Sequence, residues 1–563
     1  MINYNPKVIN KKSDTFTCGG WLDTVTDPLF LGTGKVTVAD NVEFTDKWWK
    51  KTTGLTYWGT HWWWVVYWMW ILRAETWDIA VRVYSWLFQY LDTWSTPSTP
   101  TWINIKDSWW TNDKTVSGIP TNIVSFNLWR AGWTDNVLNC TSTCTNRTVT
   151  VTGTLSDNIH IWEILRVTSG TWAWQEKLIT GNTHTIITVE WVFETVLDAT
   201  SVVTLSHQKP HVVVTNWTDT CFKWDWTTLT DLTLMPKFTS LEALHDRLWG
   251  ALSTRDQVYV SNAMTCYFTG HSNLSISPDW DTIQNIVANK DELIVYKTNS
   301  RWKIIGYDPT EFTILQMDSR IWCIAPLSAV NWNNLNFFLW YDWIYCISTL
   351  ESSTVDEWIP MSLNIDNLLD SHDIEDLKLS IGWINDNKYY LSVPRTVLWV
   401  TTSTVYIYDI AQSALKETRV LSRRKFNEYI RCAMVYWWVT YLGTQLYTVK
   451  MIWTSDIQAP SEITATVETG RRTQWDDDMD KLYWISYIQF TKATATCNVS
   501  VYYALDWWNY VLLKTQNLSS SWDITCFINK KGKDIKFKYT YGGQVAPEFL
   551  KHQIFYQPLH KLN

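Results

Sequence analysis

The stretch DELIVYKTNSRWKIIGYD, residues 291–308, decides the fold class of this chain. Two runs of branched and aromatic residues flank a short polar turn, which is the pattern of a β-hairpin. An isolated hairpin cannot bury both of its faces, so it needs neighbours of the same kind. The same strand–turn–strand pattern recurs in segments that begin at Ile71, His211, Arg247, Asn336, Lys388 and Tyr436. This radial repetition predicts an all-β fold built on a six- or seven-bladed β-propeller.

Two segments depart from the hairpin pattern. Residues 138–207 are rich in Thr and Val and predict a small β-domain inserted between propeller strands. After about Ser455, apolar and polar residues alternate with period two, as in a β-sandwich with one solvated face per sheet. The predicted division is an N-terminal arm (1–60), the first part of the β-propeller (61–137), the inserted β-domain (138–207), the remainder of the β-propeller (208–455) and a C-terminal β-sandwich (456–563). Few segments have the sequence pattern of a helix, and the best candidates, residues 363–369 and 373–378, are short.

Length and charge narrow the class of protein. A chain of 563 residues should split into several domains, and 46% apolar with 18% charged residues is typical of a globular protein. The net charge of −8 disfavours non-specific binding to nucleic acid or anionic membranes, yet it suits a passage through which DNA must slide. The N-terminal sequence does not have the pattern of a signal peptide, and the longest apolar run, residues 62–72, is too short to span a bilayer. We therefore expect a soluble protein made in a cytoplasm, with its ten cysteines as buried thiols.

The tryptophan content is anomalous. The chain has 42 Trp and only 20 Gly, whereas average usage would give about 7% Gly. Asp-Trp stands between apolar runs at 225–226, 342–343 and 506–507, where hairpins favour Asp-Gly. We hypothesise that many of these tryptophans are glycines in the working protein, specified by a reassigned codon such as UGA. The alternative is a truly Trp-rich surface.

Several stretches resemble the propeller-bearing tail proteins of short-tailed bacteriophages, known as hub, nozzle or DNA-stabilisation proteins. The resemblance is carried by DPLFLGTGKVTVADNVEFTDKWWKKTTGLTY near the N-terminus, by PKFTSLEALHDRLWGALSTRDQVYVSNAM, by IVANKDELIVYKTNSRWKIIG and by ETGRRTQWDDDMDKLYWISYIQF. The stretch SRIWCIAPLSAVNWNNLNFFLWYDWIYCIS matches closely once Trp322, Trp340 and Trp343 are read as Gly. LRVTSGTWAWQEKLI resembles a module inserted in such proteins, with Trp172 and Trp174 read as Gly. The resemblance is collinear and is most specific over residues 235–450.

The resemblance implies a structural, non-enzymatic virion protein. Such a protein forms a ring-shaped homo-oligomer, often a hexamer, below the portal, and lines part of the channel that retains and conducts DNA. Its partners would be copies of itself, the portal adaptor, other tail proteins or fibres, and DNA that passes without sequence-specific binding. Its location would be the virion tail, assembled in the host cytoplasm. The alternatives are a receptor- or glycan-binding propeller protein and a propeller glycosidase, which needs two carboxylates in one cleft.

Two motifs suggest catalysis only superficially. GTGKVT at Gly32 lacks the first glycine of a phosphate-binding loop, with Leu29 in its place, and Val36 replaces the Ser or Thr after the lysine. GHSNL at Gly270 lacks the last glycine of a nucleophile elbow, where Leu274 stands. We predict no catalytic residue and no cofactor site.

The metal-like patterns are equally incomplete. His207 and His211 have a zinc-like spacing, and Cys140 with Cys144 could join them, but Pro210 prevents a regular helix. The acidic run 476–480 lacks the Gly and Glu of a calcium loop and is better explained as a solvated turn. We predict no metal site.

Three further patterns are weighed as surface features. Asp279 and Asp281 resemble part of the Asp-box of sialidase propellers, but the match is single and partial. In NKKGKDIKFKY, from Asn529, lysines alternate with apolar residues and should form the solvated face of a strand. The basic run 423–425 is predicted to lie in a loop, and a DNA-facing role for either basic patch is the minor alternative.

Overall fold

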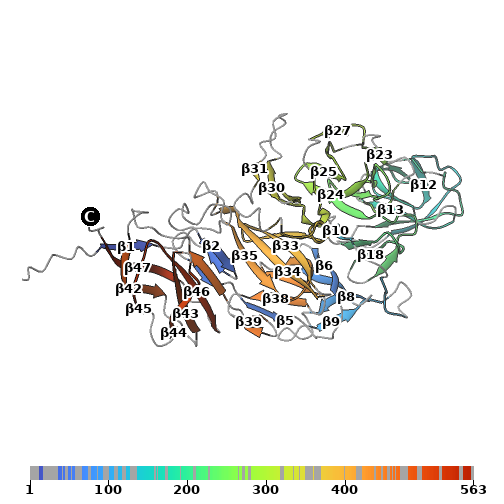
Figure 1. Cartoon of the computed structure of the whole chain (residues 1–563). Coiled ribbons are helices and arrows are strands. Elements are labelled where there is room, and N and C mark those ends of the chain that lie inside the picture. Colours follow the sequence, from blue (N-terminus) through green and yellow to red (C-terminus); the bar gives the residue numbers. More distant parts are fainter. Residues whose placement is uncertain are drawn as a thin grey trace, which may run out of the picture.

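The computed structural model describes most of residues 12–559. The stretches outside the description include 1–11, 17–35, 58–65, 93–100, 127–135, 349–358, 361–368, 414–420, 470–479, 491–496 and 560–563, together with shorter gaps between strands. The description is almost entirely β, in antiparallel sheets. In Figure 1 the sandwich lies at one end of the molecule, the propeller in the middle and the inserted barrel at the other end.

The propeller has seven four-stranded blades in the described part of the chain. Blade 1 is β6 (Val66–Arg73), β7 (Asp78–Tyr84), β8 (Leu87–Asp92) and β9 (Thr101–Asn104). Blade 2 is β10 (Asn122–Phe126), β17 (His211–Thr215), β18 (Phe222–Trp224) and β19 (Leu229–Asp231). Blade 3 is β20 (Ser240–Leu244), β21 (Arg247–Ala251), β22 (Gln257–Val260) and β23 (Asn273–Ser275). Blade 4 is β24 (Ile283–Asn289), β25 (Glu292–Lys297), β26 (Arg301–Ile305) and β27 (Thr313–Gln316).

The remaining blades complete the circle. Blade 5 is β28 (Val330–Trp332), β29 (Leu335–Trp340), β30 (Trp343–Ser348) and β31 (Ile359–Pro360), preceded by the 3-10 helix η1 (Pro326–Ser328). Blade 6 is β32 (Ile381–Asn385), β33 (Lys388–Val397), β34 (Val400–Asp409) and β35 (Leu421–Phe426), preceded by the helix α2 (Ile374–Lys378). Blade 7 is β36 (Ile430–Tyr436), β37 (Val439–Thr444), β38 (Thr448–Ile452) and β5 (Gly54–Tyr57). The first strands of successive blades contact one another, and β36 contacts β6, so the ring is closed.

Buried polar bonds join neighbouring blades. The Ser240 hydroxyl of blade 3 donates to Asn285 of blade 4 at 2.6 Å. The Arg82 guanidinium of blade 1 donates to the Thr448 hydroxyl of blade 7 at 2.8 Å. Because a buried polar group without a partner is costly, these bonds favour one arrangement of the blades.

The insert is a closed six-stranded barrel that interrupts blade 2 between β10 and β17. Its strands are β11 (Asn136–Cys140), β12 (Thr148–Thr152), β13 (Ile164–Ser169), β14 (Glu176–Asn182), β15 (Ile186–Val189) and β16 (Val202–Ser206). The interior is filled by small branched side chains, among them Val149, Leu165, Ile179 and Val203. The barrel therefore has a packed core of its own and no lumen.

The C-terminal sandwich faces one sheet against another. The first sheet has the order β1 (Lys12–Phe16), β47 (Phe549–Pro558), β42 (Lys481–Phe490) and β45 (Asp523–Gly532). The second has the order β2 (Val36–Asp40), β41 (Ala465–Thr469), β46 (Ile535–Gly543), β43 (Cys497–Leu505) and β44 (Val511–Asn517). Strand β2 also pairs with β35 of blade 6, which makes one nine-stranded sheet from blade 6 to the sandwich edge. One hydrophobic cluster contains both Phe337 and Tyr389 of the propeller and Val467 and Phe537 of the sandwich.

Short ribbons complete the described elements. They are β3 (Val42–Phe44) with β4 (Trp49–Lys51), and β39 (Ile457–Gln458) with β40 (Ser461–Glu462). Residues 12–57, within the predicted N-terminal arm, supply β1 and β2 to the sandwich and β5 to blade 7. The arm thus ties the two larger modules together.

The predicted fold class is confirmed, with seven blades. Each of the seven hairpins read from the sequence lies in a different blade. The helix predicted at residues 373–378 is α2, and Asp373 caps it by accepting from the Glu375 amide. The nine cysteines that the structure describes are free thiols. Among the described residues, no helix is both long and apolar enough to cross a membrane.

One local prediction is wrong. Residues 423–425 were predicted to lie in a loop, but they belong to β35, which pairs with β34. Arg424 is buried on this strand, with its guanidinium over the Phe426 ring. Its charge suggested exposure, whereas the long arginine side chain can bury its stem and stack its planar head on an aromatic ring.

Candidate functional site at the barrel–propeller junction

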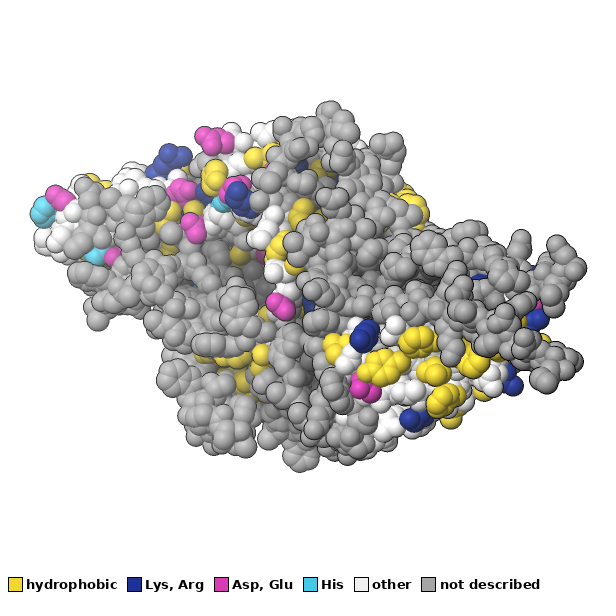
Figure 2. Space-filling model, turned by 90° about the vertical axis from the view of Figure 1, so that its left-hand side faces the viewer, with side chains coloured by type: hydrophobic (Ala, Val, Ile, Leu, Met, Phe, Trp, Pro, Cys, Tyr) yellow, Lys and Arg dark blue, Asp and Glu magenta, His cyan; other side chains and the backbone are white. Residues whose placement is uncertain are grey.

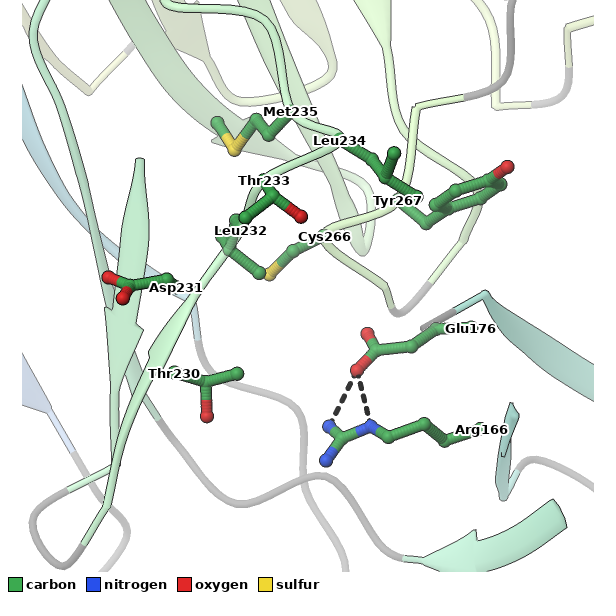
Figure 3. Close-up of a pocket in the computed structure, with 10 residues that line it drawn as sticks. All are labelled: Arg166, Glu176, Thr230, Asp231, Leu232, Thr233, Leu234, Met235, Cys266 and Tyr267. Atoms are coloured by element: carbon green, nitrogen blue, oxygen red, sulfur yellow. Dashed lines mark hydrogen bonds and ion pairs between the residues drawn. The ribbon is translucent and has the colours of Figure 1, made fainter. Parts of the chain in front are cut away.

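A small pocket lies where the inserted barrel meets blades 2 and 3 (Figure 3). Arg166 and Glu176 from the barrel form one side of it, and residues 230–235 with Cys266 and Tyr267 form the other. Its cavity volume is about 40 Å³, whereas pockets for drug-sized ligands start at about 300 Å³. The pocket can therefore hold a few water molecules, and its chemistry lies in the charged groups that line it.

Glu176 is the centre of a buried ion cluster. It lies opposite Arg166 on the neighbouring strand, and the Arg166 Nη2 is 2.5 Å from Glu176 Oε1. From blade 2, the Lys223 Nζ lies 3.1 Å from the same oxygen. Burial by itself raises the pKa of Glu176, but the charges and hydrogen bonds of Lys223 and Arg166 outweigh it and hold that pKa at about 2. The carboxylate is thus charged at neutral pH and joins the barrel to the propeller.

Two more polar contacts join the barrel to blade 3. The Arg247 Nη2 on β21 is 3.0 Å from Glu190 Oε1, just after β15. The Lys177 ammonium on β14 lies 4.7 Å from the centre of the Tyr267 ring. Lys177, Arg247 and Tyr267 are all buried. Together with Glu176–Lys223, these contacts fix the orientation of the insert.

A histidine–cysteine pair lies behind the pocket. The His211 Nε2 of β17 is 3.1 Å from the Cys266 Sγ. Burial raises the pKa of Cys266 to about 12, so the thiol stays protonated at neutral pH. A nucleophile or zinc ligand has to be a thiolate, so this pair is better suited to packing than to chemistry.

A second unusual carboxyl group is Glu242 on β20 of blade 3. Burial raises its pKa to about 7, and backbone hydrogen bonds from Ala243 and Ala288 only partly oppose the shift. Perturbed carboxyl groups mark candidate acid–base catalysts. Glycoside hydrolysis, however, requires a second carboxyl group across the cleft. The described contacts of Glu242 are with the backbone, which favours a structural role.

Glu242→Gln is expected to raise the melting temperature at pH 8 and to leave it nearly unchanged at pH 4. The folded-state pKa of about 7 lies above the ordinary value of 4.5, so burial destabilises the charged form, and stability is lost as pH rises from 4.5 through 7. Glutamine carries no charge and escapes this loss. Differential scanning fluorimetry at both pH values checks it. An equal shift at both would show that the carboxyl group does not titrate in this range.

The residues singled out in the sequence lie apart from one another. His211 contacts Cys266, whereas the Cys144 thiol donates to the Thr141 carbonyl within the barrel. Cys140 lies near Cys144, and burial, reinforced by that neighbour, raises the pKa of Cys140 to about 12. Across the described parts of the chain, no group of three or more His, Cys, Asp or Glu side chains could hold a metal ion.

Other candidates have structural roles or lie outside the described residues. The Asp281 carboxylate accepts hydrogen bonds from the Asn299 amide and the Ser300 hydroxyl, and so stabilises the β25–β26 turn. On β46, Ile535 and Phe537 are buried while Lys536 and Lys538 are partly exposed, as the alternation predicted. Gly32, Gly270, His207, Asp279 and residues 476–479 lie outside the described residues.

The sequence analysis missed the ion cluster at Glu176. In the sequence QEKLI, the alternation of a half-buried strand would place either Glu176 or its two neighbours in solvent. In the structure, residues 175–179 are all buried. The cluster forms because one face of β14 packs in the barrel and the other against the propeller. Only the docking of the two modules makes both faces internal, and a single strand carries no signal for that.

Comparison with known proteins gives matches among solved structures alone. No family model and no curated protein matches the chain. Among solved structures, Hsv2 from Kluyveromyces lactis is similar at a TM-score of 0.29 and 6% identity, over 42% of this chain and 66% of that one. An exo-β-1,3-galactanase from Phanerochaete chrysosporium gives 0.24 and 8%, over 56% and 95%. An extracellular domain assigned to a hybrid two component system of B. thetaiotaomicron gives 0.31 and 10%, over 81% and 64%. TM-scores this low carry no argument about the function of this chain.

Proposed function

We propose that this chain is a structural protein of a bacteriophage tail, a hub or nozzle subunit that works mechanically. The observation that carries the proposal is the fusion of propeller and sandwich into one body. They share a nine-stranded sheet and a hydrophobic cluster, and the N-terminal strands cross between them. A body joined in this way would transmit force between its ends. The module order also agrees with the resemblance of the sequence to short-tailed phage tail proteins.

The chemistry of the described residues supports a mechanical role. At the barrel–propeller junction, Glu176 pairs with Lys223 and Glu190 pairs with Arg247, and the thiol at the pocket is protonated. The net charge of −8 would let DNA pass without adhering. On this proposal the protein resides in the virion tail after assembly in the host cytoplasm. It extends the connector below the portal, retains packaged DNA and docks the portal adaptor, other tail proteins or fibres.

The sandwich offers a surface for self-association. In the described part of the chain, β44 and β45 are the terminal strands of their sheets. Val511 and Leu512 on β44 and Phe527 on β45 are exposed. Seen from the sandwich end, hydrophobic side chains gather on the molecular surface with a few Lys or Arg side chains among them (Figure 2). Strand edges and exposed apolar side chains are features that subunit contacts cover, which supports a ring-shaped homo-oligomer such as a hexamer.

Electron microscopy of the purified protein tests this proposal. Class averages along a symmetry axis should show rings with a channel wide enough for duplex DNA, and they would give the subunit number. Monomers without a channel, even at high protein concentration, would contradict the ring. They would favour the receptor- or glycan-binding alternative, which retention on host envelope polysaccharide would then test.

Phe527→Asp is expected to disperse the ring into smaller species without lowering the melting temperature. Phe527 is 75% exposed, so its replacement removes little core packing, while an aspartate would be buried unpaired in the subunit contact. Size-exclusion chromatography with light scattering measures the change. Val137→Asp is the matched control, since Val137 is 67% exposed on the barrel. Rings that survive Phe527→Asp would move the subunit contact away from this edge.

A further inference from the structure

The tight turns of the blades require backbone conformations that glycine adopts most easily. Two-residue hairpin turns of the favoured kinds need positive φ. His245 and Asp246 have φ of 52° and 57° in the β20–β21 turn, and Asp386 and Asn387 have 50° and 55° in the β32–β33 turn. Among the described residues, nine non-glycine residues have positive φ, against three glycines. Six of the nine are Asn or Asp, which tolerate this conformation, and the other three are His245, Lys290 and Tyr341.

The β29–β30 turn of blade 5 shows the conflict most clearly. Trp340 and Trp343 face each other across the turn, and Tyr341 between them has φ of 39°. Positive φ is common for Asn or Asp but is an outlier for a bulky residue. A glycine at position 343, after Asp342, would allow the common three-residue loop in which glycine takes the left-handed conformation. Tyr341 could then return to negative φ.

The indole groups at this turn do not fit their surroundings. The Nε1 atoms of Trp340 and Trp343 are buried without a hydrogen-bond partner. The Trp340 ring centre lies 6.0 Å from that of Trp322 and 5.5 Å from that of Tyr341. A buried tryptophan normally finds an acceptor for its N–H group. Glycine at 340 and 343 would remove both unpaired donors and leave the paired strands in place.

Two other tryptophans of the propeller, Trp249 and Trp302, have hydrogen-bond acceptors for their indole N–H groups. Trp249 is 1% exposed, and its Nε1 donates to the Leu244 carbonyl at 3.2 Å. Its ring centre lies 5.0 Å from that of Phe312. Likewise, the Trp302 Nε1 donates to the Ser300 hydroxyl at 3.1 Å. The indole N–H groups of Trp249 and Trp302 therefore have acceptors, whereas those of Trp340 and Trp343 do not.

We propose that the native protein carries glycine at positions 340 and 343 and tryptophan at positions 249 and 302. The first group would be encoded by a codon, such as UGA, that the native host reads as glycine, and the second by the ordinary tryptophan codon. This requires a host glycyl-tRNA that decodes the reassigned codon. The inference is independent of the proposed tail function.

Peptide mass spectrometry of the native protein tests the assignment directly. Trypsin should release residues 321–378 and, as an internal control, Leu248–Arg255, because no Lys or Arg interrupts either segment. In the first peptide, fragment masses at 340 and 343 should match glycine. In the second, position 249 should match tryptophan. Tryptophan at 340 and 343 would overturn the proposal, and so would glycine at 249.

A stability comparison of recombinant variants gives a second test. Trp340→Gly/Trp343→Gly should raise the melting temperature relative to the sequence as written, because it relieves the turn and removes two unpaired donors. Trp249→Gly should lower it by many degrees, because it empties a core position. A double variant that is destabilised as strongly as Trp249→Gly would show that both indoles belong in the fold. If the chain with tryptophan at both positions yields no folded protein, recovery by the double variant supports the proposal, and no recovery counts against it.

Discussion

Glu176→Ala will lower the free energy of unfolding by about 3–5 kcal/mol, the usual cost of removing one partner of a buried ion pair. The change leaves Lys223 buried without the carboxylate that lies 3.1 Å away, and it also removes the partner of Arg166. Urea denaturation followed by tryptophan fluorescence measures the loss. We expect the barrel to detach from the propeller first, because Glu176 joins the two modules.

Two controls separate the charge of Glu176 from its packing. Glu176→Gln keeps the shape and removes the charge, so it should cost nearly as much as alanine. Glu176→Leu/Lys223→Met removes both charges and should recover much of the stability, since apolar residues often replace a buried ion pair without loss. A loss below about 1 kcal/mol for Glu176→Ala, as surface pairs give, would show that the pair is solvated.

The same carboxylate sets an acid limit on stability. Its folded-state pKa of about 2 lies below the ordinary value of 4.5, so its contribution is present above about pH 4.5 and is lost as pH falls towards 2. The shift corresponds to roughly 3 kcal/mol at neutral pH. In Glu176→Ala this part of the acid-unfolding profile should disappear.

Deletion of residues 1–57 should prevent the chain from reaching a stable folded state. The deletion removes β1 and β2 from the sandwich and β5 from blade 7. Three sheets then lose strands, and β38, which pairs with β5, would expose its edge to solvent. Circular dichroism and thermal unfolding of the truncated chain measure the effect, and we expect aggregation in place of a cooperative transition.

A complementation experiment provides the control for the deletion. A separate peptide of residues 1–57 should restore a cooperative transition when it is added during refolding, because the missing strands pair through backbone hydrogen bonds. If the truncated chain alone unfolds at the same midpoint as the full chain, the N-terminal strands are not part of the stabilising structure.

The hairpins of the blades could be predicted from the sequence because each is local. Residues 291–308 carry both strands of β25–β26 and the turn between them, so their periodicity is complete within eighteen letters. The closing strand β5 could not be predicted in the same way, since its partner β38 lies about 390 residues further along the chain. A pairing of that range leaves no periodic signal at either end.

The candidate site escaped prediction for a related reason. Glu176 and Lys223 lie on strands of different modules. Each is a charged residue in a segment whose sequence pattern is that of a half-buried strand. For Arg424 the prediction was wrong, because its charge indicated an exposed loop, whereas it lies buried on a strand with its guanidinium over the Phe426 ring. Whether a charged side chain is buried depends on the group that it contacts. In both cases that contact forms only when the strands pack together.

The strand that closes the ring has a consequence for synthesis. Residues 54–57 leave the ribosome about 390 residues ahead of residues 448–452, so their place in blade 7 exists only after those later residues have been made. During this interval the strand is available to β38 of any neighbouring chain on the same messenger. Exchange of such an element between copies is a low-cost route to entangled dimers. Slow translation would lengthen this interval. The yield of correctly closed propellers should therefore depend on the rate of translation and on the density of ribosomes on the messenger.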